Sequence, residues 1–383
     1  MKVLTLGELA VIVTGRTPSP ANPEAWGDYL DFVTPSDQGS ESRSASPVRR
    51  LSEAGAALTR RVIVPAGSTQ LTCIGSTIGK ATQATSACVT NQQINSLVAR
   101  DGVANSGFLY YMVKLWSPEL KLMASGSATP IVNKTVLSGV QFRIPPLPTQ
   151  HAIAEVLGAL DDKIAANERV TSSADALVRE SFPSLTGDGE ERVISDLGDN
   201  PRDAARPPFE DGHYVGLEHV PRRSMWLTQT GNVDGLASGK FEFQADDVLF
   251  GKLRPYFHKV AVADRRGICS TDILVIRPKR TELKGFVWAA LASDGVVRRA
   301  SAMSEGTRMP RTRWSDLASC SVPWPGGRAA EAFSARVVVL RDRVAAATTE
   351  SRHLATLRDT LLPHLMSGRL TVRDAEARVE AAL

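Results

Sequence analysis

The stretch RIPPLPTQHAIAEVLGALDDKI, from Arg143 to Ile164, combines a cluster of prolines with an apolar repeat. Prolines lack backbone N–H donors and restrict the residue before them, so a strand that precedes them must stop here. The apolar residues beyond the prolines are spaced by four, three and four positions: Ile153, Leu157, Leu160 and Ile164. This spacing is typical of a helix that packs against another helix along a coiled-coil seam. The stretch therefore predicts a globular domain that ends where a long helix begins.

A similar phrase, SVPWPGGR, runs from Ser321 to Arg328, and the apolar pattern that follows it has the same phase. The corresponding residues of this second pattern are Phe333, Val337, Leu340 and Val344. The seam continues through Ala347, Leu354, Leu361 and Leu365 in this copy and through Asn167, Ala174 and Ser181 in the first. Earlier segments also correspond: 27–37 with 211–221, 72–100 with 247–279, 107–115 with 285–293, and 126–145 with 304–323. The chain is therefore predicted to be an internal duplication.

The duplication predicts an α+β fold, in which two similar mixed α/β domains are separated by two long helices. The first helix leads away from one domain and the second begins where the other domain ends, so a pair of them must run antiparallel. We predict an antiparallel coiled coil with approximate two-fold symmetry between the copies; the alternative is that each helix packs only on its own domain. The predicted boundaries are 1–148 for the first domain, 149–185 for the central helix, 190–325 for the second domain, 328–366 for the C-terminal helix and 367–383 for a tail.

Charge is distributed unevenly along the chain. Residues 1–148 carry 13 Lys+Arg against 9 Asp+Glu, residues 150–190 carry 3 against 8, and residues 220–313 carry 17 against 9. Basic domains favour a polyanionic partner, whereas the acidic helix would repel one and is predicted to contact protein. No run of 18 apolar residues occurs, which predicts no membrane span. Four scattered cysteines predict reduced thiols and a cytoplasmic location.

Sequence motifs of catalysis are missing. The segment IGSTIGK, residues 74–80, resembles a phosphate-binding loop, but three residues separate its glycines where the motif has four. Ala81 also follows the lysine, where that motif has Ser or Thr. The scattered cysteines and six histidines predict no metal site. These observations favour a binding protein over an enzyme.

Polar side chains suited to nucleic acid occur at matching places in both halves. In the second half, KLRPYFHK would place Lys252, Arg254, Tyr256 and His258 on one face of an extended strand. The other candidates in that half are Arg222, Arg223, Arg308, Arg311 and Arg313. The candidates in the first half are Arg16, Thr17, Lys80, Asn91, Gln92, Gln93, Asn133 and Lys134. Arginine suits guanine and phosphate, whereas Asn and Gln suit adenine, so the two domains are predicted to read different sequences.

Together these features resemble the specificity subunit of type I restriction–modification systems. The resemblance rests on TGRTPS (14–19), IPPLPTQHAIAEVLGALDDKIAANERV (144–170), VLFGKLRPYFHKV (248–260), CSTDILVIRP (269–278) and LRDTLLPHLMSGRL (357–370). It implies two target recognition domains, each reading one half of a split, asymmetric site in double-stranded DNA. It also implies two methylation subunits that bind S-adenosylmethionine and methylate adenine, and a restriction subunit, a translocase and nuclease, that uses ATP with Mg. The sequence departs from the family pattern at VPWPGGRAAEAF, which lacks the Pro-x-x-Gln lead-in.

The implied function is that of a non-catalytic recognition subunit that binds no cofactor itself. Six charged residues of the helices are predicted to lie near subunit-docking surfaces: Asp161, Asp162, Lys163, Arg341, Asp342 and Arg343. One alternative is a recognition adaptor of another methylation-based defence system or of an orphan methyltransferase. A different class of alternative is a stand-alone nucleic-acid enzyme, which turnover by the isolated chain would support.

Overall fold

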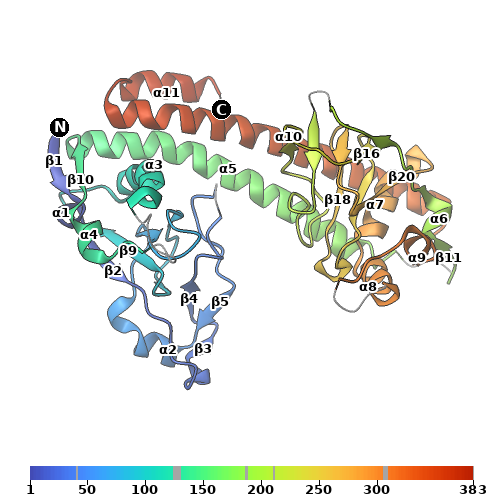
Figure 1. Cartoon of the computed structure of the whole chain (residues 1–383), viewed down its shortest axis with the longest axis horizontal. Coiled ribbons are helices and arrows are strands. Elements are labelled where there is room, and N and C mark those ends of the chain that lie inside the picture. The colour runs from blue at the N-terminus through green and yellow to red at the C-terminus, as the bar shows by residue number, and fades with distance from the viewer. Residues whose placement is uncertain (40–41, 124–130, 186–188, 210–211, 305–308, 383) are drawn as a thin grey trace. The chain divides into compact units, whose positions relative to one another are not determined.

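The computed structural model describes residues 1–39, 42–123, 131–185, 189–209, 212–304 and 309–382. The chain divides into two compact units (Figure 1). Unit 1 comprises Met1–Ala165 together with Arg352–Leu383, and unit 2 comprises Ala166–Ser351. Each unit holds one mixed α/β domain and a part of both long helices, α5 (Leu147–Ser181) and α10 (Gly327–Ser367). No helix in the described ranges is both long enough and apolar enough to cross a membrane.

Unit 1 contains two four-stranded sheets and a two-stranded ribbon. One sheet has the order β2 (Ala10–Thr14), β9 (Ile94–Ala99), β6 (Thr69–Thr72), β7 (Ala81–Gln83). The other has the order β3 (Trp26–Gly27), β5 (Arg49–Leu51), β4 (Leu30–Val33), β8 (Cys88–Thr90), and the ribbon pairs β1 (Lys2–Thr5) with β10 (Gln141–Ile144). The shorter helices are α1 (Leu6–Leu9), α2 (Glu53–Leu58), α3 (Ser106–Met123), α4 (Lys134–Gly139) and α11 (Val372–Glu380), with 3₁₀ turns at Pro23–Ala25 and Arg60–Val62. Figure 1 shows α11 folding back along the end of α10, so the predicted tail is largely helical.

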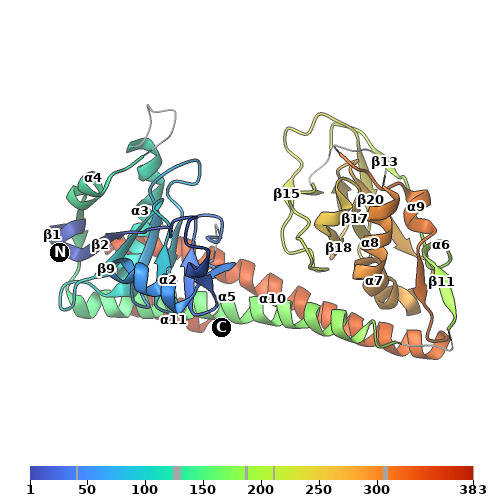
Figure 2. The ribbon, with the colours of Figure 1, turned by 90° about the horizontal axis from the view of Figure 1, so that it is seen from below.

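Unit 2 repeats this plan. Its first sheet has the order β12 (Gly198–Asp199), β20 (Ile273–Pro278), β17 (Val248–Gly251), β18 (Val260–Val262). The second has the order β13 (Ala204–Ala205), β16 (Lys240–Phe243), β19 (Gly267–Cys269), β14 (His213–Val215), β15 (Gly231–Asn232), and the ribbon pairs β11 (Glu191–Val193) with β21 (Ser321–Pro323). The helices are α6 (Ile194–Leu197), α7 (Lys284–Ala292), α8 (Asp294–Met303) and α9 (Trp314–Ala318), with 3₁₀ turns at Pro255–Phe257 and Thr281–Leu283. Helix α7 packs against β17, β18 and β20 in one apolar core (Figure 2).

The two units share strand order as well as strand number in their first sheets. The order β2-β9-β6-β7 of unit 1 corresponds to β12-β20-β17-β18 of unit 2. Each second sheet contains one parallel pair, β4 with β8 and β14 with β19, among otherwise antiparallel neighbours. Each unit also closes by pairing its first strand with the strand before the long helix. The predicted duplication of a mixed α/β domain is confirmed.

The long helices are antiparallel within each unit. In unit 1, Arg358 Nη1 donates to Asp161 Oδ1 at 2.6 Å. In unit 2, Asn167 Nδ2 donates to Glu350 Oε2 at 2.7 Å, and the ring centroids of Phe182 and Phe333 lie 5.9 Å apart. Positions further along α5 therefore meet positions earlier along α10. Most seam residues named from the sequence are buried, which confirms the antiparallel pairing and excludes helices that pack only on their own domains.

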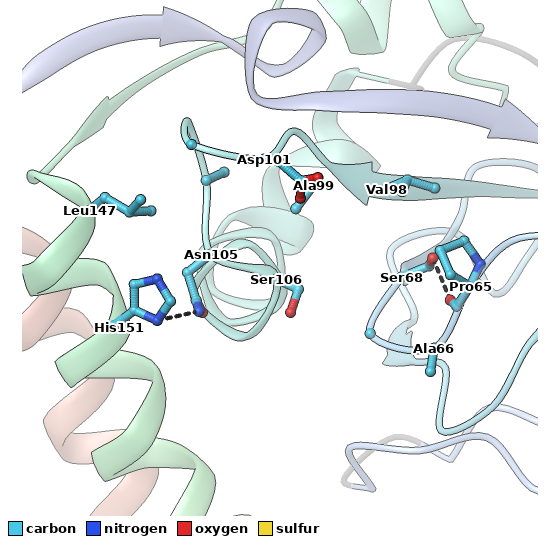
Figure 3. A pocket seen from close by; sticks show the side chains of 13 residues that line it. Pro65, Ala66, Ser68, Val98, Ala99, Asp101, Asn105, Ser106, Leu147 and His151 are labelled. Atoms are coloured by element: carbon cyan, nitrogen blue, oxygen red, sulfur yellow. Dashed lines mark hydrogen bonds between the residues drawn. The ribbon is translucent and has the colours of Figure 1, made fainter.

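Gln150 explains why the first long helix begins where it does. Its side chain is buried and ties the helix to the turn before α3. Its Oε1 accepts from Asn105 N at 2.9 Å, and its Nε2 donates to Pro145 O at 3.0 Å. His151 follows it, with Nδ1 3.0 Å from Asn105 Nδ2 beside a cavity (Figure 3).

The second copy has a different tie at the same place. Buried Ala330 occupies the position that corresponds to Gln150 and offers no side-chain hydrogen bond. Instead, the buried Ser334 Oγ of α10 accepts from Gly285 N at 2.9 Å. A Cβ on Gly285 would lie 2.4 Å from Ser334 O, so the close approach of α7 to α10 requires glycine. The loss of the Pro-x-x-Gln lead-in is thus accommodated by a serine one turn later.

Candidate nucleic-acid interface

One loop in each unit holds, or is hydrogen-bonded to segments that hold, most of the polar residues named from the sequence. These are the β6–β7 loop of unit 1, residues 73–80, and the β17–β18 loop of unit 2, residues 252–259. The two loops make matching backbone hydrogen bonds. Cys73 N donates to Gln93 O in unit 1, as Lys252 N donates to Asp272 O in unit 2. Val132 N donates to Cys73 O, as Thr312 N donates to Lys252 O. Thr72 N donates to Lys80 O, as Gly251 N donates to Lys259 O. The same backbone framework therefore presents different side chains in the two units.

Both loops need left-handed backbone at the same two positions. In unit 1 these positions are Gly75 and Gly79, each with φ of 92°. In unit 2 they are Arg254 and His258, with φ of 51° and 53°. Glycine adopts this conformation freely, whereas other residues in it are strained and persist only where their surroundings hold them. The strain at Arg254 makes this side chain a candidate for a functional role.

The expectation that residues 252–258 form one face of an extended strand is wrong. Pro255–Phe257 form a 3₁₀ turn, and the left-handed residues on either side reverse the chain. Pro255 cannot donate to a strand ladder and favours such a turn. Alternate residues of the segment therefore do not share one face.

The turn nevertheless collects several cations and an aromatic side chain in one place. Tyr256 is 56% exposed. The Arg222 guanidinium lies 4.2 Å from the centroid of the Phe257 ring, which orients it by a cation–π contact. Arg311 Nε lies 3.3 Å from Asp272 Oδ1, and Lys252 Nζ donates to Thr271 O at 3.0 Å. Together with Arg254, these side chains form a basic, partly exposed surface of a kind that suits phosphates and base edges.

His258 anchors this turn to the end of α7 and the start of α8. It is 3% exposed, its Nε2 lies 2.8 Å from Ala292 O, and its Nδ1 lies 3.3 Å from Asp294 Oδ1. Arg223 Nη2 donates to the same carboxylate at 2.7 Å. Burial lowers the pKa of His258, and Arg179 and Arg223 lower it further, against the opposing effects of Ala292 O and Asp294. The prediction that His258 contacts DNA is wrong, because its ring is covered and its nitrogens face protein.

The amide side chains of residues 91–93 belong to a segment that lies beside the β6–β7 loop. Thr17 Oγ1 donates to Gln92 Oε1 at 2.7 Å, and Asn91 Nδ2 donates to Gln93 Oε1 at 2.9 Å. Exposed Arg16 is next to Thr17, and its backbone N donates to Thr90 O. The structure thus brings these five predicted residues together.

Lys80 is the exception in this loop. Its Nζ donates to Gln38 O at 2.8 Å and to Pro35 O at 3.3 Å. Lys259 at the equivalent place in unit 2 donates likewise to Leu217 O. Both ammonium groups therefore tie the loop to a neighbouring loop, which gives Lys80 a structural role.

The remaining candidates lie at the start of a short helix. Exposed Asn133 caps α4 by accepting from Val136 N at 2.9 Å, and exposed Lys134 is the first residue of that helix. Exposed Arg313 precedes α9 at the matching place in unit 2, where its backbone N donates to Asp316 Oδ2 at 2.9 Å. Each of these segments is joined to the neighbouring loop through the backbone of Val132 or Thr312. Arg308 falls outside the described residues.

Comparisons with known proteins agree with this arrangement. Residues 1–173 match the family model described as the type I restriction modification DNA specificity domain. The MjaIX specificity subunit of Methanocaldococcus jannaschii is 24% identical, with 97% of this chain and 93% of the relative covered. The HindI specificity subunit of Haemophilus influenzae is 29% identical over 45% of this chain and 39% of its own length. The S subunit from M. genitalium has a similar fold, with a TM-score of 0.58, 16% identity and 95% coverage of both chains.

The chain is similar to type I restriction–modification specificity subunits over nearly its whole length. Family members recognise DNA sequences within complexes that contain other subunits. The β6–β7 loop lies within the residues that match the DNA specificity domain.

Of the six charged residues predicted to dock partners, two are turned toward their own unit. Asp161 is 4% exposed and accepts from Tyr111 Oη as well as from Arg358. Burial raises the pKa of the Tyr111 hydroxyl, and the neighbouring Asp161 charge raises it further. Arg341 is held by Asp246 at 3.0 Å over the Trp288 ring. The Asp161 carboxylate is covered by the folded helix pair and is not itself available to a partner, while the prediction that it lies near a docking surface stays a prediction.

The other four are more accessible. Asp162 is 80% exposed, with Arg43 Nη1 3.5 Å away. Asp342 and Arg343 are exposed, and Lys163 is half-buried. These residues directly follow the inward-facing one in each copy, and their docking role stays a prediction.

Sequence reasoning missed several residues that shape the interface. The acidic partners Asp272 and Asp294 and the Phe257 platform were not singled out, and neither were the left-handed positions. The signal that would have found the latter is the repeat itself. Aligning the copies places Gly75 against Arg254 and Gly79 against His258, with the same offset for both pairs.

Proposed function

We propose that the two units read the two separate blocks of an asymmetric, bipartite DNA site. The β6–β7 loop reads one block and the β17–β18 loop reads the other. The observation that carries this proposal is the shared backbone framework with different polar side chains: amides around one loop, and arginines, a lysine and a tyrosine around the other. A common framework with exchanged side chains gives two readers of different sequence.

In this proposal the chain has no catalytic activity and binds no cofactor. Two methylation subunits bring S-adenosylmethionine and methylate adenine, and a restriction subunit brings ATP with Mg for translocation and cleavage. The complex works in the cytoplasm. What supports a passive role is the family's recognition function, together with exposed charges on both long helices that are available to partner proteins.

The test is a methylation map. The chain is co-expressed with its methylation subunit in a host that lacks other adenine methylation, and modified adenines are mapped with and without the chain. We expect a split, asymmetric motif that disappears without the chain. A continuous or palindromic motif would contradict the two-reader proposal.

Two variants sharpen the map. Ala substitution of Arg254 or Arg311 should relax one block and leave the other unchanged, at a cost of about 1–3 kcal/mol for a base contact. A substitution that removes only a phosphate contact should weaken binding to all sequences and reduce its salt dependence. In parallel, the purified chain alone is incubated with DNA and S-adenosylmethionine or ATP; turnover would favour the stand-alone enzyme.

A further inference from the structure

The hydrogen-bond direction of Gln93 is fixed by its neighbour. Gln93 N donates to Asn91 Oδ1 at 3.2 Å, and a backbone N–H can only donate. The Asn91 carbonyl oxygen is therefore the atom on that side, and its Nδ2 donates to Gln93 Oε1 at 2.9 Å. Because Nδ2 cannot accept, the Gln93 amide must turn its oxygen toward Asn91. The amide nitrogen, Nε2, is then the group left to face outward.

The free end of Gln93 lies at the β6–β7 loop. A Cβ built on Gly75 would lie 3.4 Å from Nε2, so this amide passes directly beside a glycine. Gln93 is half-buried, and no residue in the described part of the chain accepts a hydrogen bond from its Nε2. The side chain is thus held at one end and open at the other.

Unit 2 has the same backbone turn but lacks the side-chain hydrogen bond that orients Gln93 in unit 1. Asp272 N donates to Ser270 Oγ at 3.2 Å, which matches the backbone half of the Asn91–Gln93 arrangement. The serine hydroxyl accepts this hydrogen bond, but serine has no side-chain NH2 group that could orient the side chain two residues later. Asp272 is held instead by Arg311 at 3.3 Å. The side-chain hydrogen bond from Asn91 to Gln93 is therefore an addition to a turn that forms without it in unit 2.

We propose that Asn91 is a positioning residue that makes Gln93 a hydrogen-bond donor toward DNA, so that unit 1 distinguishes keto bases from amino bases at one position. In the major groove, thymine O4 and guanine O6 accept hydrogen bonds, whereas adenine N6 and cytosine N4 donate them. Where it faces this exocyclic position, a donor-only Gln93 pairs with the first group and leaves an unpaired donor against the second; purine N7 accepts in both adenine and guanine and does not discriminate between them. This proposal rests on the proposed function, and it replaces the expectation that Gln93 reads adenine bidentately, which would need Oε1 as well.

Asn91 offers two informative substitutions. Asn91→Ser installs the residue of unit 2, retains the turn and releases the Gln93 amide. Asn91→Asp retains the turn but places a carboxylate oxygen opposite the amide. Gln93 must then donate its Nε2 to the new carboxylate and present Oε1, so its direction is reversed. Gln93→Ala removes the contact altogether.

Asn133→Asp is the matched control for charge. It adds the same negative charge close to the same loop and retains the α4 cap, because aspartate caps helices as well as asparagine does. It should weaken binding through the added charge, and because Asn133 is itself a candidate DNA contact, any change in base preference should fall at a position other than the one read by Gln93.

The experiment compares methylation maps and binding of the assembled methyltransferase to a DNA library at fixed salt. We expect wild type to require thymine or guanine at one position of the block read by unit 1. Asn91→Asp should shift that preference to adenine or cytosine. Asn91→Ser and Gln93→Ala should reduce the discrimination by about five- to 150-fold, the range of a single mismatch. Thermal melting of each variant checks that unit 1 is folded.

The outcomes separate this proposal from the proposed function. If wild type gives a split motif but Asn91→Asp keeps the wild-type base, the donor assignment is overturned while the two-reader function stands. The same holds if Gln93→Ala leaves every position unchanged. If wild type gives no chain-dependent motif, both are overturned.

Discussion

The β6–β7 loop and the β17–β18 loop make the same left-handed turns with different residues. The first uses Gly75 and Gly79, which carry no strain and no side chain. The second uses Arg254 and His258, at a cost of order 1–3 kcal/mol each. That cost is offset around His258 by the hydrogen bond from its Nε2 to Ala292 O. The candidate DNA-contacting side chains thus project from the neighbouring segments in unit 1 and from the loop itself in unit 2.

The two copies differ most at one matched charged position of the long helices. Asp161 is buried between Tyr111 and Arg358, whereas Arg341, the corresponding residue of the second copy, is a more accessible partner of Asp246. Asp161→Ala leaves the buried Arg358, among the described residues, with only the exposed Asp359 as an ion partner and removes the acceptor of Tyr111 Oη, so it should destabilise unit 1 by about 3 kcal/mol. Arg341→Ala should cost unit 2 roughly 1 kcal/mol. Hydrogen exchange of peptides from each unit measures both, and equal losses would refute the distinction.

Exchanging the left-handed residues gives the next largest effect. A Cβ on Gly79 would lie 2.9 Å from Ser117 O in an already unfavourable conformation. Gly79→Ala should therefore destabilise unit 1 by about 2–3 kcal/mol. His258→Gly should change unit 2 less, because relief of strain offsets the lost hydrogen bond to Ala292. Denaturant unfolding of both variants provides the comparison, and a larger loss for His258→Gly would contradict it.

Arg254→Gly should separate stability from recognition. Glycine relieves the left-handed strain, so unit 2 should be unchanged or stabilised by up to about 1 kcal/mol. Binding should weaken by about 1–3 kcal/mol at the block read by unit 2 only, if Arg254 contacts a base. Melting and DNA-binding measurements on the same preparation test both. Lower stability together with unchanged binding would assign Arg254 a structural role.

The smallest effect is a pH dependence confined to unit 2. Burial lowers the pKa of His258 below its ordinary value of 6.5, so protonation favours the unfolded chain. The stability that neutral His258 contributes is complete above about pH 6.5 and is lost as the pH falls through the interval down to the folded-state pKa. His258→Asn should reduce this loss as the pH is lowered from neutral to mildly acidic values. Melting curves at several pH values test it, and an identical pH dependence for both proteins would exclude His258 as the cause.

The duplication and the helix pair could both be predicted without coordinates. These features depend on spacing along the chain: apolar residues recur at helical intervals, and prolines recur at matching places in the two halves. The antiparallel direction follows from connectivity alone. Burial of Leu157, Leu160 and Leu361 in the seam confirms that such a pattern specifies which face of a helix is covered.

Which polar residues face outward could be seen only in the folded chain. The sequence singles out His258, Lys80 and Asp161 on the same grounds as their neighbours Tyr256, Gln92 and Asp162. In the folded chain, however, the side chains of the first three form hydrogen bonds with other groups of the protein. The segment Lys252–Lys259 alternates like a strand, but its proline and two left-handed residues turn it. Hydrogen-bond direction at Gln93 likewise depends on a partner two residues away in a folded turn. Such roles depend on contacts between distant segments, and spacing along a chain does not encode which donor meets which acceptor.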